Sequence, residues 1–304
     1  MSIAIARPRT QVWLLDYLEL TKPRIVMLVI ITGIPALLMA RSGYPGNGVF
    51  WGTLAGIALA AASAACFNNY LDRDIDRLMK RTAARALPSG LLPASHALGL
   101  GFLLAGLSWI VLAAWGNLLS AAIGLVSIVY YAVVYTAWLK RRTPQNIVIG
   151  GGAGASAPLI AWAAVTGQVG LPAVLLAAIV FLWTPPHFWA LSLYRRDDYA
   201  RAGIPMLPVT HGEAETRRQI LFYSLALVPA TLALGPLGVV GPLYWIPAAA
   251  LGLLFIHYAR RLLKTARVSE AVHLFRFSIL YLFLLFVFMT GDALVRNLGR
   301  GGLG

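Results

Sequence analysis

Nine long apolar runs dominate this sequence and leave room for little besides membrane-spanning helices. A helix needs about 20 predominantly apolar residues to cross the hydrocarbon core of a bilayer. Only 12% of the 304 residues are charged, which is about half the share found in soluble domains. We therefore expect an all-α polytopic membrane protein with a single transmembrane domain over residues 1–304. The nine transmembrane helices are expected at approximately 25–41, 48–71, 95–115, 118–139, 146–166, 171–194, 218–236, 240–260 and 271–292.

The distribution of Lys and Arg between the runs predicts the orientation of the chain. If residues 1–20 form a cytoplasmic N-terminal segment, 21 of the 25 basic residues fall in segments on the cytoplasmic side. Short loops rich in Lys and Arg stay on that side, so we expect the N-terminus in the cytoplasm and the C-terminus outside. Topology thus explains most of the net charge of +14, and we expect no nucleic-acid partner.

Acidic residues are better functional markers here, because topology does not require them. Three of the eleven acidic residues, Asp72, Asp74 and Asp76, fall within five positions. Asn68, Asp72 and Asp76 are spaced by four residues, which places them on one face of a helix. Like charges at this spacing repel each other, and Mg²⁺ carrying a phosphorylated ligand would relieve that repulsion. A solvated helix end with Asp–Arg pairs is the alternative interpretation.

A second charged loop, at about 195–217, faces the same side in this topology as the loop at about 72–94. It contains Asp197, Asp198, Glu213 and Glu215, whereas the loops expected on the other side are short and almost uncharged. Long connections in compact domains are usually functional. We therefore expect these two loops to form one active site.

Four stretches of the sequence resemble a known family. Asn68-xxx-Asp72-xxx-Asp76, followed by MKRT at 79–82, resembles the first aspartate motif of the UbiA-type intramembrane prenyltransferases. The other three are similar to the protoheme IX farnesyltransferase (heme O synthase) branch of that family. They are LTKPR at 20–24, YTAWLKRRTPQNIVIGG at 135–151, and the stretch 183–209 with TPPH at 184–187 and DYARAGIPMLPV at 198–209. The resemblance extends from about residue 12 to residue 292.

The resemblance implies a single prenyltransferase domain with Mg-dependent activity. Members of the protoheme IX farnesyltransferase branch transfer a farnesyl group from farnesyl diphosphate to a vinyl group of heme B, with addition of water, and release heme O and diphosphate. One or two Mg²⁺ ions are then the cofactor, and heme B is a substrate. The resemblance also implies the cytoplasmic (inner) membrane of a prokaryote, with the active-site loops on the cytoplasmic side. A heme A synthase or a terminal oxidase assembly is a further partner that it suggests.

Roles for individual residues follow from matching the family motifs. The implied metal ligands are Asp72, Asp76 and Asp198, with Asn68 as a polar ligand or as a partner of one. Many family members carry another Asp four residues after the second motif's first Asp, where this chain has Ala202. The second metal site therefore depends on Asp198. Candidates for binding the diphosphate oxygens are the basic residues near these motifs: Arg77, Lys80, Arg81, Arg85, Lys140 and Arg141.

His187 follows two prolines in the sixth run, where the helical hydrogen-bond ladder is broken. Two roles are open for it: contact with heme, as an iron ligand or otherwise, or packing with the ring bonded to a neighbouring carbonyl. Two alternative functions also stay open. One is a UbiA-type prenyltransferase with a different aromatic or tetrapyrrole acceptor. The other is a polytopic transporter, although transporters place polar groups near the bilayer midplane and the charges here collect at one face.

Overall fold

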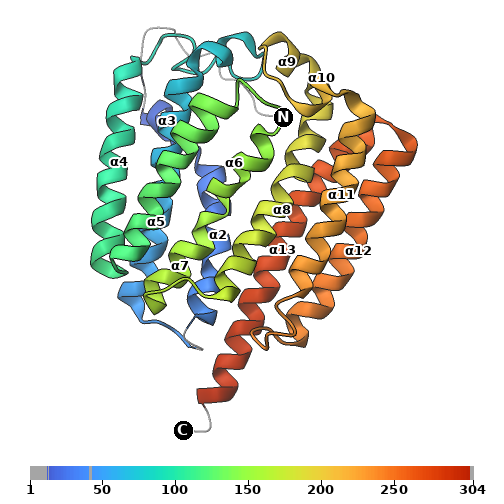
Figure 1. The fold of residues 1–304 in the computed structure, drawn as a ribbon. Helices are drawn as coiled ribbons and strands as arrows, with labels where there is room; N and C mark the ends of the chain where they lie inside the picture. Colours follow the sequence, from blue (N-terminus) through green and yellow to red (C-terminus); the bar gives the residue numbers. More distant parts are fainter. Residues whose placement is uncertain (1–11, 13, 41–42, 302–304) are drawn as a thin grey trace.

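The computed structural model describes residues 12, 14–40 and 43–301, and within those ranges it contains helices and turns but no strand (Figure 1). The helices run nearly parallel in one bundle. In chain order they are α1 (Leu14–Leu20), α2 (Pro23–Met39), α3 (Asn47–Leu78), α4 (Ala94–Trp115), α5 (Leu118–Val129), the π-helix η1 (Tyr130–Leu139), α6 (Asn146–Gly154), α7 (Ser156–Thr166), α8 (Leu171–Tyr194), α9 (Arg196–Arg201), α10 (Leu207–Thr210), α11 (Gly212–Leu232), α12 (Pro242–Thr265) and α13 (Val268–Gly301).

Seven helical segments of the described residues are long and apolar enough to cross a membrane, which makes this a multi-pass membrane protein. They are α3, α4, α5 with η1, α6 with α7, α8, α12 and α13. Helices α1 and α2 meet at a bend of 49° and form an eighth span if counted together. The remaining expected span, at 218–236, falls on α11. The first turns of this helix carry Glu213, Glu215, Arg217 and Arg218. The count of nine stays a prediction.

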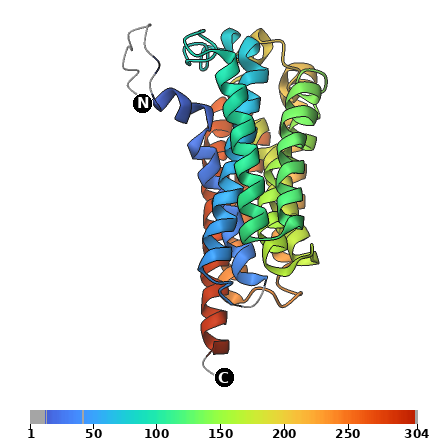
Figure 2. The same cartoon turned by 90° about the vertical axis from the view of Figure 1, so that its left-hand side faces the viewer.

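The orientation of the two termini also stays a prediction, because the structure does not distinguish the two sides of a membrane. Residues 1–11 and 302–304 lie outside the described residues. The structure does establish which segments share an end of the bundle. The end of α3, the turns at 79–93 and helices α9 and α10 lie at one end, and the last turns of α13 lie at the other (Figures 1 and 2). The two expected active-site loops therefore share an end, although residues 72–78 continue α3 as helix.

The core of the bundle is apolar and includes large rings such as Trp189, Phe255 and Phe286, all essentially inaccessible. Helix α8 packs against α6, α11 and α13, and α3 packs most extensively against α4. Many outward-facing side chains are also large and apolar, for example Phe102 and Leu253. Such a surface suits contact with lipid tails rather than water.

Glycines allow α3 and α4 to approach closely. A Cβ at Gly56 would lie too close to the fully buried side chain of Leu112, and a Cβ at Gly52 would meet Trp115. Small residues at helix–helix contacts increase van der Waals packing, which drives association in membranes. This contact holds α3, and therefore its charged end, in a fixed position.

We expect Gly56→Val to lower the free energy of unfolding by about 1–3 kcal/mol, because an added side chain overpacks the contact with Leu112. Gly106→Ala on α4 is the matched control, since a Cβ there meets open space. Unfolding of both variants in lipid discs, followed by circular dichroism, measures the difference. Equal stability of the two variants would contradict the tight contact.

Candidate active site

The last turns of α3 place Asn68, Asp72 and Asp76 on the face that is turned into the protein. All three are buried, and Asp72 is only 2% exposed, whereas Asp74 between them faces outward. The helix runs without a break to Leu78, so the four-residue spacing becomes a shared face, as the sequence predicts. A carboxylate buried in this way requires partners that offset its lost hydration.

The π-helix η1 and Lys140, which follows it, contact Asn68 and Asp72. Thr136 Oγ1 accepts a hydrogen bond from Asn68 Nδ2 at 3.1 Å, and Lys140 Nζ donates to Asp72 Oδ2 at 2.5 Å. The second contact lies four residues further along both segments than the first, at 72 and 140 instead of 68 and 136. π-Helical geometry is rare and is often found at functional sites. Here it directs Thr136 and the following Lys140 toward α3.

The two oxygens of Asp72 differ in their partners. Asn68 Nδ2 donates to Oδ2 at 2.7 Å, and Lys140 binds the same oxygen. Oδ1 is buried and has no hydrogen-bond partner among the described residues. A buried acceptor without a partner costs about 1–3 kcal/mol, so this oxygen is suited to a cation. A carboxylate oxygen is a ligand that Mg²⁺ prefers, and the site therefore fits a divalent cation.

Lys140 stays charged beside this carboxylate. Burial by itself lowers the pKa of Lys140, but the charge of Asp72 and the hydrogen bond to it raise that pKa above its ordinary value. If a metal ion were bound at the free carboxylate oxygen, the neighbouring ammonium group could bind oxygens of a phosphate group held by that ion. Lys140 is thus the predicted diphosphate-binding residue with the best-defined position.

Helix α9 contributes the second acidic motif. Asp198 is buried, and its oxygens lie 3.2 Å from Arg201 Nη1 and 3.8 Å from Arg195 Nη1. The neighbouring Asp197 is exposed, so only Asp198 is turned into the protein. The dependence of the second metal site on Asp198 stays a prediction.

Two tyrosines connect the acidic motifs electrostatically. Burial raises the pKa of Tyr199, next to Asp198 in the chain, while Lys140 and Arg81 oppose that rise. Tyr135 on η1 lies within electrostatic range of both Asp72 and Tyr199. Tyr135 and Tyr199 therefore lie between the two motifs in electrostatic terms, and a shared site stays a prediction.

The carboxylates themselves do not form one tight cluster. Across 14–40 and 43–301, no group of three or more acidic, His or Cys side chains is arranged to hold a metal ion. The Asp76 carboxylate interacts electrostatically with Lys22 and Lys140, and its backbone carbonyl accepts a hydrogen bond from Thr82. Mg²⁺ in phosphoryl-binding sites is usually held by one or two carboxylates together with substrate phosphates and water. Three converging carboxylates are therefore not required.

Three of the six candidate diphosphate ligands contact protein groups in this structure, and their role in binding diphosphate stays a prediction. Arg141 binds Asp74 with two bonds, at 2.7 and 2.6 Å, on the exposed side of α3. Arg77 Nε donates to the carbonyl of Pro88 at 2.6 Å and so secures the turns that follow α3. Lys80 and Arg81 are exposed and keep the predicted role.

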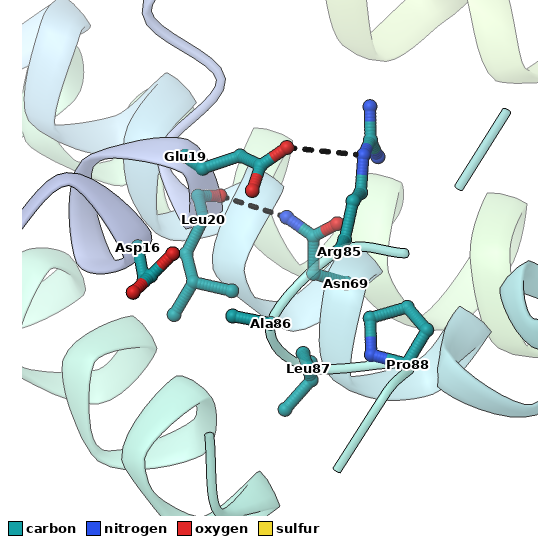
Figure 3. Close-up of a pocket in the computed structure, with 8 residues that line it drawn as sticks. All are labelled: Asp16, Glu19, Leu20, Asn69, Arg85, Ala86, Leu87 and Pro88. Carbon is teal, nitrogen blue, oxygen red and sulfur yellow. Dashed lines mark hydrogen bonds and ion pairs between the residues drawn. The ribbon is translucent and has the colours of Figure 1, made fainter. Parts of the chain in front are cut away.

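Arg85 is the third of these basic residues, and it links the turns after α3 to α1 (Figure 3). Its Nε lies 3.3 Å from Glu19 Oε1. Beside this ion pair, Asn69 Nδ2 donates to the carbonyl of Leu20 at 2.8 Å. These contacts attach the end of α1 to α3 directly beside the candidate site.

His187 is packed inside the bundle. Its Nδ1 lies 2.7 Å from Ser278 Oγ, and its ring stacks on Trp183 and Phe275 with centroids 4.2 and 4.8 Å away. Desolvation and stacking hold the ring in one orientation. This geometry corresponds to the packed role of the two that were open, with a serine hydroxyl as the partner.

Sequence reasoning missed Lys22, which forms part of the site. It lies between α1 and α2, and its Nζ donates a hydrogen bond to Asn68 Oδ1. Lys22 also lines a cavity of about 100 Å³ whose walls are mostly apolar and small, such as Ala61, Ala64 and Gly154. The LTKPR stretch contains this lysine, but a Lys before a Pro is also what a helix start at a membrane surface would show.

Comparison with known proteins identifies the family. The model of the UbiA prenyltransferase family matches residues 27–287. The protoheme IX farnesyltransferase of Gloeobacter violaceus is 51% identical over 289 residues, or 94% of each chain. A protein of the same name from a Roseiflexus species is 49% identical over 92% of this chain, which spans about half, 52%, of that longer protein.

Solved structures show the same fold at lower identity. A structure described as giving insights into digeranylgeranylglyceryl phosphate synthase in membranes has a TM-score of 0.76 at 21% identity, over 92% of this chain and 98% of that one. A UbiA homologue from Archaeoglobus fulgidus, bound to GPP and Mg²⁺, has a TM-score of 0.62 at 16% identity, over 90% and 99%.

The helical bundle and its charged end define a multi-pass membrane protein of the intramembrane prenyltransferase class. The chain belongs to the UbiA prenyltransferase family. The resemblance of its motifs to the protoheme IX farnesyltransferase branch is confirmed by relatives at about 49% identity over most of the chain.

Removing Lys140 and removing the adjacent Arg141 should have very different effects on stability. We expect Lys140→Gln to lower the free energy of unfolding by about 3–5 kcal/mol in the presence of a chelator, because it leaves a buried carboxylate unpaired. Arg141→Gln breaks an exposed pair and should cost less than about 1 kcal/mol. Denaturant titrations in the same detergent measure both values, and equal losses would show that Asp72 does not depend on Lys140.

Proposed function

We propose that this chain transfers a farnesyl group from farnesyl diphosphate to a vinyl group of heme B, with addition of water, at the end of the bundle that holds Asp72 and Asp198. The observation that carries this proposal is the buried Oδ1 of Asp72, which has no hydrogen-bond partner among the described residues and lies on the carboxylate that Lys140 binds. Asn68 links this carboxylate to Lys22, which lines an apolar cavity. The choice of substrates rests on the name of the relatives, protoheme IX farnesyltransferase. We further propose that this end faces the cytoplasm in the cytoplasmic membrane of a prokaryote.

The difficult step is breakage of the allylic C–O bond, which leaves diphosphate and a resonance-stabilised farnesyl cation. Asp72 and Asp76 would hold Mg²⁺, with Asp198 facing the same space, and the ion would supply charge stabilisation to the leaving diphosphate. Lys140, Lys80 and Arg81 bind its remaining oxygens. Donors that are positioned before the reaction stabilise the developing charge without having to reorganise.

The acceptor needs no nucleophilic side chain from the protein. The terminal carbon of the heme vinyl group bonds to C1 of the farnesyl cation, and positive charge moves to the vinyl carbon attached to the porphyrin. Water adds to that carbon and loses a proton, which completes the hydroxyethylfarnesyl group. The bundle must therefore exclude other water, which would quench the farnesyl cation, and the mostly apolar lining of the cavity offers water few partners.

The cavity beside Lys22 is the proposed place for the farnesyl tail. Along α3 it extends from Ala65 to Ile57, a distance of about 12 Å at 1.5 Å per residue. Its lining from α2, α3, α6 and α7 is mostly apolar, with hydroxyl groups at Ser127, Tyr131 and Ser156. A polar end at Lys22 and an apolar length below it match a molecule with a charged head and a hydrocarbon tail.

The reaction predicts different outcomes for two neighbouring acids. In lipid discs with heme B, farnesyl diphosphate and Mg²⁺, mass spectrometry should detect heme enlarged by one farnesyl group and one water. Asp72→Asn should reduce the rate by at least about 100-fold, because the charge stabilisation at the leaving group is lost. Asp74→Asn, at an exposed position that only binds Arg141, should change it by no more than about twofold.

Two results would count against this proposal. Unmodified heme from folded wild-type protein with Mg²⁺ present would exclude the reaction. Product formation at the normal rate by Asp72→Asn, or in excess EDTA, would instead exclude the assigned metal site.

Filling the cavity should change the preferred length of the prenyl donor. Ala61→Phe places a ring in the proposed tail site, so kcat/KM for farnesyl diphosphate should fall more than kcat/KM for geranyl diphosphate, which has one isoprene unit less. Ala55→Phe, on an exposed part of α3, is the control. Competition assays with both donors give the ratio directly, and an unchanged ratio would place the tail elsewhere.

A further inference from the structure

Lys22 is the first member of a chain of polar contacts that ends at the carboxylate of Asp72, on the oxygen Oδ2. Its Nζ donates to Asn68 Oδ1, and Asn68 Nδ2 donates to Asp72 Oδ2 at 2.7 Å and to Thr136 Oγ1 at 3.1 Å. Asn68 is 5% exposed and Asp72 2%. The series therefore runs through the protein interior, where hydrogen bonds between polar groups are least weakened by water.

The donor and acceptor types allow only one orientation of the Asn68 amide. An ammonium group has three donors and no acceptor, so the atom of Asn68 that faces Lys22 must be the carbonyl oxygen. The NH₂ group then faces Asp72 and Thr136. Thr136 uses its own hydroxyl hydrogen on the carbonyl of Tyr131 at 2.8 Å, so it can only accept from Asn68.

This orientation decides which oxygen of Asp72 stays vacant. With its NH₂ group toward Asp72, Asn68 binds Oδ2, the oxygen that Lys140 also binds. With the amide reversed, the carbonyl of Asn68 would face the carboxylate and repel it. The Asp72 side chain would then lose a donor that fixes its rotation, and Oδ1 would no longer have a defined direction.

The backbone of Lys22 indicates that its position is imposed by the fold. Its φ of 50° and ψ of 61° are left-handed, a region that costs non-glycine residues of order 1–3 kcal/mol and persists only where surrounding structure requires it. The bend of 49° between α1 and α2 occurs at this residue. Asn69, next to Asn68 in α3, holds the carbonyl of Leu20 just before it.

We propose that Lys22 is a positioning residue: by binding Asn68 Oδ1 it makes Asn68 a donor to Asp72 rather than a metal ligand, and so directs Asp72 Oδ1 toward a divalent cation. This inference rests on the proposed metal-assisted transfer, but it concerns only residues of this chain. It assigns Lys22 to the site through Asn68 and needs no contact between Lys22 and the substrate.

Binding of Mn²⁺, used as a paramagnetic substitute for Mg²⁺ and measured by electron paramagnetic resonance in lipid discs with inorganic diphosphate, tests this role. Lys22→Met should weaken Mn²⁺ binding by about 10–100-fold, as loss of partners behind metal ligands commonly does. Lys22→Arg should restore most of it. On Coulomb grounds alone, removing a cation from beside a cation site would strengthen binding, so the direction of the change is diagnostic.

A second comparison separates indirect from direct action. In the Asn68→Ala background, Lys22→Met should cause no further loss of Mn²⁺ affinity, because its route to Asp72 is already broken. An equal loss in both backgrounds, or tighter Mn²⁺ binding by Lys22→Met, would overturn the proposal. Arg24→Met, which removes an exposed cation two residues away, should leave Mn²⁺ binding unchanged.

The Mn²⁺ measurements still test the role of Lys22 if one variant does not fold or if the proposed reaction does not occur. Lys22→Gln replaces Lys22→Met if that variant does not fold, because an amide can both donate and accept and so no longer fixes the orientation of Asn68. Thermal unfolding in the same discs identifies such a failure. If the wild-type protein produced no farnesylated heme, the proposed function would be rejected but the role of Lys22 would not. The Mn²⁺ affinities would still decide the role of Lys22.

Discussion

The candidate site depends on one buried carboxylate whose two oxygens are treated differently. Burying Asp72 at the end of α3 requires partners, and Lys140 and Asn68 both bind its Oδ2. If a third donor bound Oδ1, the side chain would be better satisfied but would have no oxygen left for a cation. The protein thus keeps an unsatisfied acceptor at a cost of about 1–3 kcal/mol. Such costs are tolerated at functional sites, where surrounding packing supplies the stability.

The surrounding structure is arranged to keep that carboxylate in place. Close glycine-mediated packing against α4 fixes α3, and η1 brings Thr136 and Lys140 into register with Asn68 and Asp72. Helix α1 and the turns after α3 are joined by the Glu19–Arg85 ion pair beside the same site (Figure 3). Contacts from three distant parts of the chain therefore converge on the last turns of one helix.

Much of the fold could be predicted because apolar periodicity and length are local properties. The expected runs at 118–139 and 171–194 match α5 with η1 and α8 residue for residue. Helix α1 was absent from the prediction, because Asp16 and Glu19 interrupt its apolar character and the first run was placed at 25–41. Helix α11 shows the opposite case. The sequence predicts a span at 218–236, and α11 packs on α8 and α12 like its neighbours, but it is not among the helices that are long and apolar enough to cross a membrane, because its first turns are charged.

The acidic face of α3 was predictable from spacing, but the partners of those side chains were not. Lys140 and Arg141 are adjacent and equally basic, yet one binds buried Asp72 and the other exposed Asp74. Their directions depend on η1, whose wider turn departs from the 3.6-residue period that sequence reasoning assumes. Lys22 was missed for a related reason: its left-handed backbone has no signature in the residue types.

A membrane bundle suits the proposed chemistry because it separates the two halves of the donor. The charged groups lie at one end, where phosphate oxygens can meet cations and remain hydrated during entry. The cavity along α3 begins at Lys22 and continues between small apolar side chains, where a hydrocarbon tail meets the same kind of surface as in lipid. The bond that breaks would lie at the boundary between the two.

Polar groups deeper in the cavity would expose the farnesyl cation to water or to a competing nucleophile. Apart from Lys22, the only polar side-chain groups in the described lining are the hydroxyls of Ser127, Tyr131 and Ser156. In the proposed reaction, Lys22, which lines the cavity and is linked to Asp72 through Asn68, would therefore lie at the boundary between the leaving group and the hydrocarbon tail.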